Sequence, residues 1–324
     1  MHEQTATSPY ALSDELVTYV QGLEGCGPQT QVVPFAEGAH NLVFRGYNGP
    51  AGFEDFVLRH AKHPAHDAML RKEARVRYLI GDQAPRIWQC GRLASGVSVL
   101  LQEYIPGQPK NFNDLSAPEI GALAAVLGEV HAVVGERFSG RSGDEPSCCE
   151  GTYEDYVWAM IHESVHVRLS RFDTRPYPAA MAMLRDGTQV LRNSLARQAG
   201  HFRRPNQVFS LQHHDCNQDN VLWCSNGSPK LIDWNPTFGD PADELAYIFT
   251  DNHCSQSFTE LFLQGYQAPR GSGDVTDRIP VYVLKNLLDD LAWAIEMREL
   301  HPGDLAWNAV YQQRLGAMSC YLQS

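Results

Sequence analysis

The pattern of apolar residues changes near residue 105, and this change limits what the chain can fold into. Before that point, short segments with alternating or β-branched and aromatic residues predict strands, and Gly-rich turns separate them. A segment rich in helix formers, residues 66–80, interrupts the series, and a shorter helix capped by Ser13 precedes it. Five strands are predicted: TQVVPF, NLVFRGY and FEDFVLRH before the longer helix, and PRIWQCG and GVSVLLQEYI after it.

Helical patterns dominate after residue 107. The first predicted helix spans residues 116–134, with Ser116 as its N-cap and Glu119 three residues further on. The middle of this half is an exception, because three short apolar runs between polar turns predict strands around a site: QVFSLQHH, NVLWC and PKLID. We therefore expect an α+β protein with two lobes. Residues 1–103 would form a five-stranded antiparallel lobe and residues 104–324 a mainly helical one.

The composition excludes some classes of partner. The chain has 324 residues and a formal net charge of −12, which argues against nucleic acid and anionic membranes, because both bind basic surfaces. Cationic ligands are mildly favoured. The 8 cysteines are spread along the chain without a C-x-x-C pair, so we expect reduced thiols. No long apolar run and no secretory leader is present, so the expected location is the cytoplasm. A monomer and a homodimer both remain open.

One polar constellation in the second half suits phosphoryl transfer from a nucleotide. That reaction needs a divalent metal ion on the phosphates, a carboxylate that orients or deprotonates the acceptor hydroxyl, and cations that hold the phosphates. Asp215 and Asn220 lie on a predicted loop in HHDCNQDN, and Asp233 follows the next strand pair in LIDW. Mg²⁺ prefers such oxygen ligands. The alternatives are turn-forming residues at strand ends, or a metal site at His213 and His214, which consecutive residues could form only with an unusual turn.

The order of these motifs resembles the signature of the aminoglycoside phosphotransferase and choline kinase superfamily, which is related to the protein-kinase fold. Three motifs carry the resemblance: H-x-D-x4-N at residues 213–220, then Ile232-Asp233-Trp234, then GDPADELA. The resemblance covers nearly the whole chain. EGAHNLVFRG resembles the phosphate-loop strand pair, FVLRH the phosphate-binding strand, KEARVRYL the helix with the partner glutamate, and LLQEYIPG the interlobe hinge. The resemblance implies a bilobal protein-kinase-like fold with a nucleotide between the lobes.

The resemblance also implies a role for each matching residue. Asp215 would be the catalytic base, and Asn220 and Asp233 would hold Mg²⁺. A solvated helix face remains the alternative for Glu73, because basic residues crowd its segment. The positions that would bind the nucleotide, ATP or GTP, are Arg59 on the phosphates, Glu73 as the partner of Arg59, Gly38 and Asn41 in the loop over the phosphates, and the backbone of Glu103 and Ile105 against the adenine.

Several positions depart from the pattern of the superfamily. Arg59 stands where protein kinases have Lys, and arginine keeps the charge and can bind phosphate through two hydrogen bonds. His214 stands where Gly is usual, and Asn217 where a second His is frequent. Glu244 replaces the usual Asp of GDPxxDLA, and we expect it to keep a structural contact at altered reach. The effect of His214 and Asn217 on catalysis stays open.

Acidic residues near the C-terminus could line a pocket for a cationic acceptor, as the resemblance suggests. Asp289 and Asp290 lie in the apolar run NLLDDLAW, where a charge is costly unless it is paired. Glu296 follows in the same predicted helix. The alternative for all three is an ordinary solvated helix face.

Three functional hypotheses follow. The first is a kinase that acts on a hydroxyl group of an aminoglycoside-like or other cationic antibiotic, because TYEDYVWAM resembles a segment of hygromycin-type phosphotransferases. The second is a metabolite kinase for choline, an amino alcohol or a sugar. The third, from another class, is a nucleotide-binding pseudokinase that serves as a scaffold, which the presence of Asp215, Asn220 and Asp233 disfavours.

Overall fold

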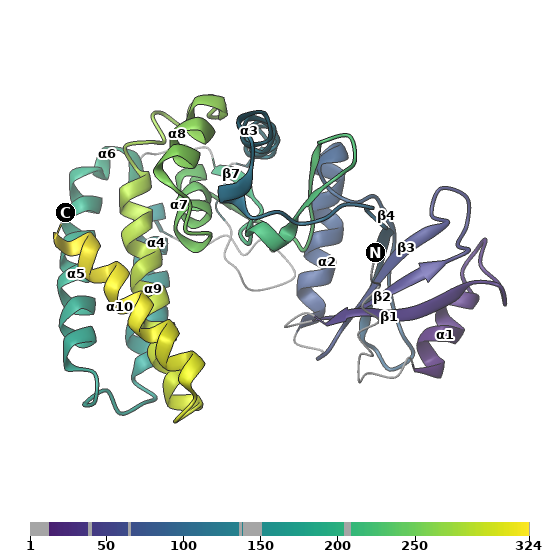
Figure 1. Cartoon of the computed structure of the whole chain (residues 1–324), viewed down its shortest axis with the longest axis horizontal. Helices are drawn as coiled ribbons and strands as arrows, with labels where there is room; N and C mark the ends of the chain where they lie inside the picture. Colours follow the sequence, from purple (N-terminus) through teal and green to yellow (C-terminus); the bar gives the residue numbers. More distant parts are fainter. Residues whose placement is uncertain are drawn as a thin grey trace.

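The chain folds into two lobes that a short connection joins (Figure 1). The computed structural model describes residues 13–37, 41–63, 66–135, 138, 151–203 and 209–323. One lobe holds a sheet with two helices, and the other holds a small group of short strands and most of the helices. The predicted α+β class and bilobal fold are confirmed.

A five-stranded antiparallel sheet forms the N-terminal lobe, with strand order β1-β2-β3-β5-β4. Helix α1 (Asp14–Gln21) begins where predicted, because the Ser13 hydroxyl accepts a hydrogen bond of 3.2 Å from the Leu16 amide. Helix α2 (Asp67–Val76) separates the third and fourth strands. The strands are β1 (Gln31–Glu37), β2 (Asn41–Tyr47), β3 (Asp55–Ala61), β4 (Ile87–Arg92) and β5 (Ser98–Glu103).

The alternation of side chains along β5 assigns each residue to one face of this sheet. Leu101 belongs to the apolar cluster around Leu16 of α1, whereas Leu100 packs in a cluster with Leu70 of α2. Arg59 of β3 lies opposite Leu100, and the next facing pair along the ladder on this side is Val57 with Gln102. The sheet face that packs against α2 therefore also carries the side chains of Arg59, Val57 and Gln102.

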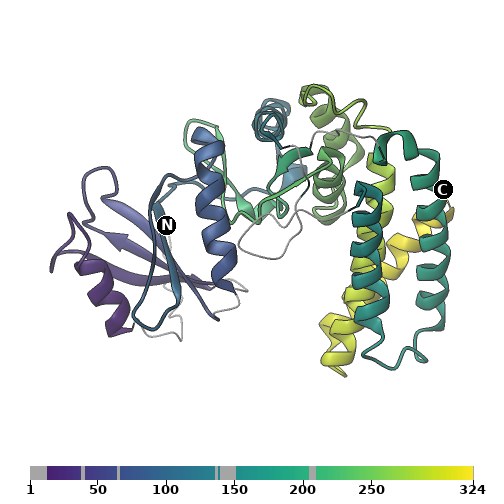
Figure 2. The same ribbon diagram turned by 180° about the vertical axis from the view of Figure 1, so that it is seen from behind.

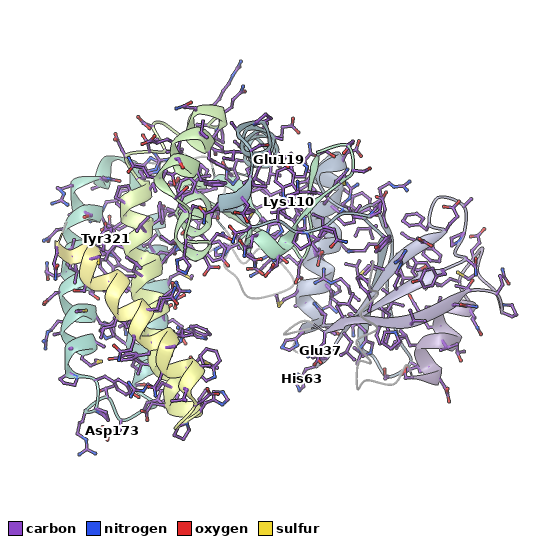
Figure 3. The ribbon with its side chains drawn as sticks, viewed as in Figure 1. Glu37, His63, Lys110, Glu119, Asp173 and Tyr321 are labelled. Carbon is purple, nitrogen blue, oxygen red and sulfur yellow. The ribbon has the colours of Figure 1, made fainter. Side chains whose placement is uncertain are left out.

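A hinge segment, residues 103–107, leads into the second lobe. Beyond it, Lys110 forms an ion pair of 2.5 Å with Glu119 in the first turn of α3 (Ala117–His131) (Figure 3). The predicted cap of α3 is confirmed, because the Ser116 amide donates to the Glu119 carboxylate over 2.8 Å. The segment that follows the hinge is thereby held against the first turn of α3.

The C-terminal lobe is mainly helical, and its core is one large apolar cluster. Seen from behind, α5, α9 and α10 form the outer end of the molecule (Figure 2). Of the described helices, none is both long and apolar enough to cross a membrane. The remaining helices are α4 (Tyr153–Ile161), which continues into a π-helical turn (His162–Val167), α5 (Pro178–Arg197), α6 (Ala199–Phe202), α7 (Pro241–Asp251), α8 (Gln256–Gly265), α9 (Ile279–Leu300) and α10 (Leu305–Gln323).

In the described part of this lobe, five short strands interrupt the helices. Three of them, β7 (Phe209–Gln212), β8 (Val221–Trp223) and β9 (Pro229–Leu231), were predicted. The other two, β6 (Val134–Gly135) and β10 (Thr237–Gly239), flank β7 in a three-stranded sheet. The loop from β7 to β8 and the segment after β9 carry the polar constellation of the sequence.

Candidate active site

Three side chains hold the Asp215 carboxylate, which lies in the loop between β7 and β8. One oxygen accepts hydrogen bonds from the Tyr247 hydroxyl at 3.0 Å and from the Asn217 amide at 3.1 Å. The other accepts from the Asn220 amide at 3.1 Å. Burial raises the pKa of Asp215 above its ordinary value, although the hydrogen bonds from Tyr247 and Asn217 act in the opposite direction. The carboxylate is therefore held in one orientation by hydrogen bonds from three neutral side chains.

Asn217, which departs from the family pattern, has a structural role in this loop. Its side-chain oxygen accepts from the amides of Asp219 at 2.9 Å and Asn220 at 3.2 Å, so it caps the single turn Gln218–Asn220. The Asn220 nitrogen in turn donates to the backbone oxygen of Asp215 at 2.8 Å. Since that nitrogen is used, the side-chain oxygen of Asn220 is the atom that suits a metal ion.

A buried histidine supports this loop. His213 is fully buried, accepts from the Asp215 amide at 3.2 Å through Nδ1, and contacts the Ile232 carbonyl at 2.8 Å through Nε2. These two contacts fix the tautomer with the proton on Nε2. Burial lowers the pKa of His213, which keeps the ring neutral. His213 is thus a buried residue that supports the loop.

Glu244 of α7 supports the same loop. Its carboxylate accepts from the amides of His213 at 3.0 Å and His214 at 2.6 Å, and it contacts the buried His131 ring at 2.7 Å. The expected structural contact of Glu244 is therefore confirmed. His214 has a φ of 63°, a left-handed conformation that favours Gly, which accounts for the usual Gly at this position.

Arg59 and Glu73 of the N-terminal lobe form a linked group of charges with Asp233 of the C-terminal lobe. Arg59 is 5% exposed and donates to Glu73 over 2.5 Å, and its second terminal nitrogen pairs with Asp233. Burial raises the pKa of Glu73 to about 7, against the opposing effect of Arg59. The predicted pairing of Arg59 with Glu73 is confirmed, and the alternative of a solvated helix face for Glu73 is wrong.

A cavity between the lobes, called the interlobe cavity here, is lined by three of the six predicted nucleotide residues, Arg59, Glu103 and Ile105. Its polar lining includes Arg59, Gln102, Asn220 and Asp233. Apolar side chains close it from both lobes, and the hinge segment forms one edge. These apolar and hinge residues include Val43 and Val57 from the sheet, Leu222 and Ile232 from the second lobe, and Glu103, Tyr104 and Ile105 from the hinge.

The other predicted nucleotide positions lie differently. The Glu103 side chain turns toward Arg86 and accepts from its amide at 3.1 Å, so only the backbone of Glu103 is placed to meet a ligand. Asn41 is buried at the start of β2, opposite Ala61, and is not among the described residues that line the interlobe cavity. Gly38 lies outside the described residues.

Tyr247 was not among the predicted site residues, although it contacts Asp215. The signal was present in ADELAYIF, because a helix places residues three apart on one face, and Glu244 was already expected to make a structural contact. Burial raises the pKa of Tyr247 far above its ordinary value, so its hydroxyl stays protonated and donates. The site therefore draws one hydrogen-bond donor from α7.

The acidic residues of α9 are paired with arginines rather than solvated alone. Arg168 contacts Asp289 at 2.8 Å and Glu296 at 3.2 Å. Arg314 of α10 contacts Asp290 at 3.2 Å. Helix α9 approaches the catalytic loop one turn earlier, where Asn286 lines a small cavity with His214 and Tyr247. Asp289, the first of the three acidic residues, therefore lies about one helical turn after Asn286.

Asp290 is expected to give folding stability a characteristic pH dependence. Burial raises its pKa to about 6, so the folded state keeps a proton that the unfolded state releases near pH 4. The stability contributed by that proton is present below pH 4 and is lost as the pH rises to about 6. We therefore compare the free energy of unfolding of Asp290→Asn with that of wild type at two pH values. The difference, variant minus wild type, should be about 2 kcal/mol more positive at pH 7 than at pH 4.

Urea unfolding of both proteins at several pH values checks this expectation. Asp277, an exposed aspartate before α9, supplies the control, because Asp277→Asn should change stability equally at every pH. A difference between wild type and Asp290→Asn that stays flat, or that grows as the pH falls, would contradict the expectation.

Known proteins share the sequence pattern and the fold of this chain. Residues 31–278 match the family model described as the phosphotransferase enzyme family, and no match was found among curated proteins. A thermostable mutant of aminoglycoside phosphotransferase APH(4)-Ia, solved with AMP-PNP and hygromycin B, has a similar structure. Its TM-score is 0.66 at 18% identity, with 96% of this chain and 98% of that chain covered.

Two further solved structures show the same fold. A choline/ethanolamine kinase family protein from Mesorhizobium loti gives a TM-score of 0.65 at 18% identity, covering 96% of this chain and 95% of its own. Choline kinase LicA from Streptococcus pneumoniae gives 0.62 at 15% identity, covering 90% and 94%. Because the family model spans most of the sequence, the chain belongs to the phosphotransferase enzyme family, whose solved relatives include aminoglycoside phosphotransferases and choline kinases.

Proposed function

We propose that the protein transfers the γ-phosphate of ATP to a hydroxyl group of an aminoglycoside-like or other cationic antibiotic. One observation carries the phosphotransfer part of this proposal. The fixed carboxylate of Asp215 is hydrogen-bonded to Asn220, and Asn220 lines the same cavity as Asp233 and Arg59. A base, two oxygen ligands for a metal and a phosphate-binding cation thus converge on one cleft, as phosphoryl transfer requires.

The nucleotide would lie in the interlobe cavity. Its base would lie between Val57 and Leu222, with its polar edge toward the backbone of Glu103 and Ile105. Its phosphates would extend toward Arg59, which Glu73 holds in place. The AMP-PNP bound to the related APH(4)-Ia structure supports a nucleotide donor of this kind.

Asn220 and Asp233 would hold Mg²⁺. Their side chains offer an amide oxygen and a carboxylate, the hard oxygen ligands that Mg²⁺ selects, and both line the interlobe cavity. When bound, Mg²⁺ neutralises charge on the phosphates and orients them. Asp215 would then orient the acceptor hydroxyl and accept its proton, and Arg59 would hold the phosphates.

The proposed acceptor is cationic because acidic side chains of α9 follow the point where this helix meets the catalytic loop. Asp289 and Glu296 are both partly accessible and share Arg168 as their partner. An ammonium group of an acceptor could take the place of the Arg168 guanidinium at either carboxylate. Hygromycin B, bound to the related APH(4)-Ia structure, supports an acceptor of the aminoglycoside type.

A metabolite kinase is the second candidate. It is favoured by the choline/ethanolamine kinase family protein, whose TM-score of 0.65 is nearly that of the antibiotic kinase, 0.66, and by the choline kinase, whose TM-score is 0.62. The fold therefore gives no preference between the two acceptor classes. Both candidates use the same nucleotide cleft and the same catalytic loop.

Ligand-dependent thermal unfolding followed by an acceptor screen tests the proposal. Mg²⁺-ATP at a hundred times its dissociation constant should stabilise the protein by about 2.7 kcal/mol. ADP release is then measured with aminoglycosides, choline, ethanolamine and sugars. Absence of any nucleotide effect would refute both candidates, whereas turnover with choline alone would replace the antibiotic by a metabolite. Resistance of a susceptible bacterium that expresses the protein is the corresponding cellular test.

Asp289 should contribute to acceptor binding without affecting the nucleotide. Asp289→Asn removes one charge next to the expected position of an acceptor ammonium group, so KM for a cationic acceptor should rise about tenfold, which corresponds to the loss of one charge-assisted hydrogen bond. KM for ATP should stay within about twofold. Steady-state kinetics of wild type, Asp289→Asn and the exposed control Asp277→Asn measure both constants. An equal rise of the two KM values would indicate a structural role for Asp289 instead.

A further inference from the structure

A second cavity, called the α5 cavity here, lies between α5 and the π-helical turn that continues α4. Its volume is about 490 Å³, which is in the range of sites that bind small molecules. It shares no lining residue with the interlobe cavity. The proposed phosphotransfer therefore gives the α5 cavity no role.

The floor of the α5 cavity is apolar. Leu184 of α5 is 1% exposed, and Val165 and Leu169 on the opposite side are each 3% exposed. The half-buried Met181 precedes Leu184 by three residues, so it lies on the same face of α5. Such a floor stabilises a ligand that removes apolar surface from water. It does not suit a sugar or a polyamine, whose polar groups would lose their hydrogen bonds with water there.

The rim of the α5 cavity is polar and basic. Among the described residues that line the cavity, none is acidic, although the chain has 38 acidic and 26 basic residues. The rim consists of exposed side chains from both sides: His166, Ser170, Arg185, Gln189 and Arg192. The last three lie on one face of α5, because they are four and three residues apart. An apolar floor below a basic rim fits an anion with an apolar body.

Arg185 is the residue best placed to bind an anionic group. Arg168, which also lies beside this cavity in the sequence, pairs with Asp289, whereas Arg185 forms no ion pair with any residue that the structure describes. The Arg192 guanidinium lies 5.3 Å from the centre of the Trp158 ring, a contact that leaves its charge in place. Because arginine binds a carboxylate through two parallel hydrogen bonds, a ligand carboxylate would find its partner in Arg185.

The side of the α5 cavity that faces α5 has an irregular backbone. Residues 162–167 form a π-helical turn, and two of them, Val165 and His166, line the cavity. Turns of this kind are rare in helices and occur frequently at functional sites. The irregular turn thus coincides with the cavity, in a helix that is otherwise regular.

We propose that the α5 cavity binds a small carboxylic acid with an apolar body, its carboxylate at Arg185 and its body against the apolar floor. This ligand differs in charge from the proposed cationic acceptor, which the basic rim would repel. It also differs in place from the nucleotide, which would lie in the interlobe cavity. The α5 cavity would therefore bind it whether or not the protein transfers phosphate to an antibiotic.

Calorimetry with three probes tests this site. Naphthoate and decanoate are carboxylates with an aromatic and an aliphatic body, and naphthamide is the neutral analogue of the first. Wild type should bind both acids at one saturable site. It should bind naphthoate about tenfold more tightly than naphthamide, a factor that corresponds to one charge-assisted hydrogen bond. Saturating Mg²⁺-ATP should leave these affinities unchanged.

Variants on α5 locate the binding site. Arg185→Gln should weaken naphthoate about tenfold and leave naphthamide unchanged, because only the charge is lost. Thr188→Phe, at a half-buried lining position, takes up space and should weaken all three probes. Arg197→Gln supplies the matched control, because Arg197 is exposed, lies in the last turn of the same helix and does not line the cavity. It should bind every probe as wild type does.

Four outcomes would overturn the proposal. The first is an affinity of Arg185→Gln for naphthoate equal to that of wild type. The second is an equal loss in Arg197→Gln, which would indicate general attraction to positive charge. The third is competition between the acids and Mg²⁺-ATP, which would place the acids in the interlobe cavity. The fourth is the absence of binding by either acid at concentrations up to about 10 mM.

Discussion

Replacing Asp215 by Asn is expected to lower kcat by about a thousandfold, because proton transfer to a positioned base contributes about 10²–10⁴ to the rate of such reactions. The amide has almost the shape of the carboxylate, and the Tyr247 hydroxyl, 3.0 Å away, can turn to accept instead of donate. The affinity for Mg²⁺-ATP should stay within a few fold, since the other residues of the cleft are unchanged. Acceptor-dependent ADP release measures the first quantity and calorimetry the second.

Asp219 supplies the matched control for this prediction. It lies four residues further on in the same loop, it is exposed, and Asp219→Asn makes the same chemical change. Its kcat should be close to that of wild type. If Asp215→Asn retains comparable turnover, the carboxylate is not the base, and the proposed mechanism has to place the acceptor hydroxyl elsewhere.

Most of the fold could be predicted from the sequence because its elements are defined locally. The strands β1 to β5 have alternating or β-branched residues between Gly-rich turns, and α3 has its own capping box. The strands β6 and β10 could not be predicted, because two and three residues have no detectable periodicity and form strands only by pairing with β7. The division of the chain at residues 103 and 104 stays a prediction.

The candidate site was predictable in its residue types and less so in its contacts. Arg59 and Asp233 lie 174 residues apart, and no pattern in the sequence predicted that they pair. The left-handed backbone of His214 and the pairing of α9 acids with Arg168 depend on tertiary structure in the same way. The roles assigned to Asp215, Asn220 and Asp233 remain predictions.

The helix that supports the catalytic loop starts at a buried carboxylate. Asp240 is 1% exposed and caps α7, accepting from the Ala242 amide at 3.1 Å. It also accepts two hydrogen bonds from the buried Arg278, at 2.7 and 2.9 Å, and one from the Tyr282 hydroxyl at 3.0 Å. Burial alone would raise the pKa of Asp240, but hydrogen bonds from His201 and Arg278 hold it well below its ordinary value.

Asp240→Ala should lower the free energy of unfolding by about 3–5 kcal/mol, because it leaves the buried Arg278 without its partner and removes a helix cap. Urea unfolding at pH 7 measures the loss. The pKa of Asp240 is depressed by folding, so its contribution is present above about pH 4 and is lost as the pH falls below that value. The difference between wild type and Asp240→Ala should therefore shrink in acid. The exposed Asp277→Asn should stay within about 0.5 kcal/mol of wild type at either pH.

The activity of Asp240→Ala separates support of the fold from a part in the chemistry. Asp240 precedes the turn of α7 that carries Glu244 and Tyr247, and these two side chains, not Asp240, contact the catalytic loop. Below its unfolding temperature, the variant should therefore keep kcat within a few fold of wild type per folded molecule. A loss as large as that of Asp215→Asn in protein that is still folded would mean that the start of α7 positions the base itself.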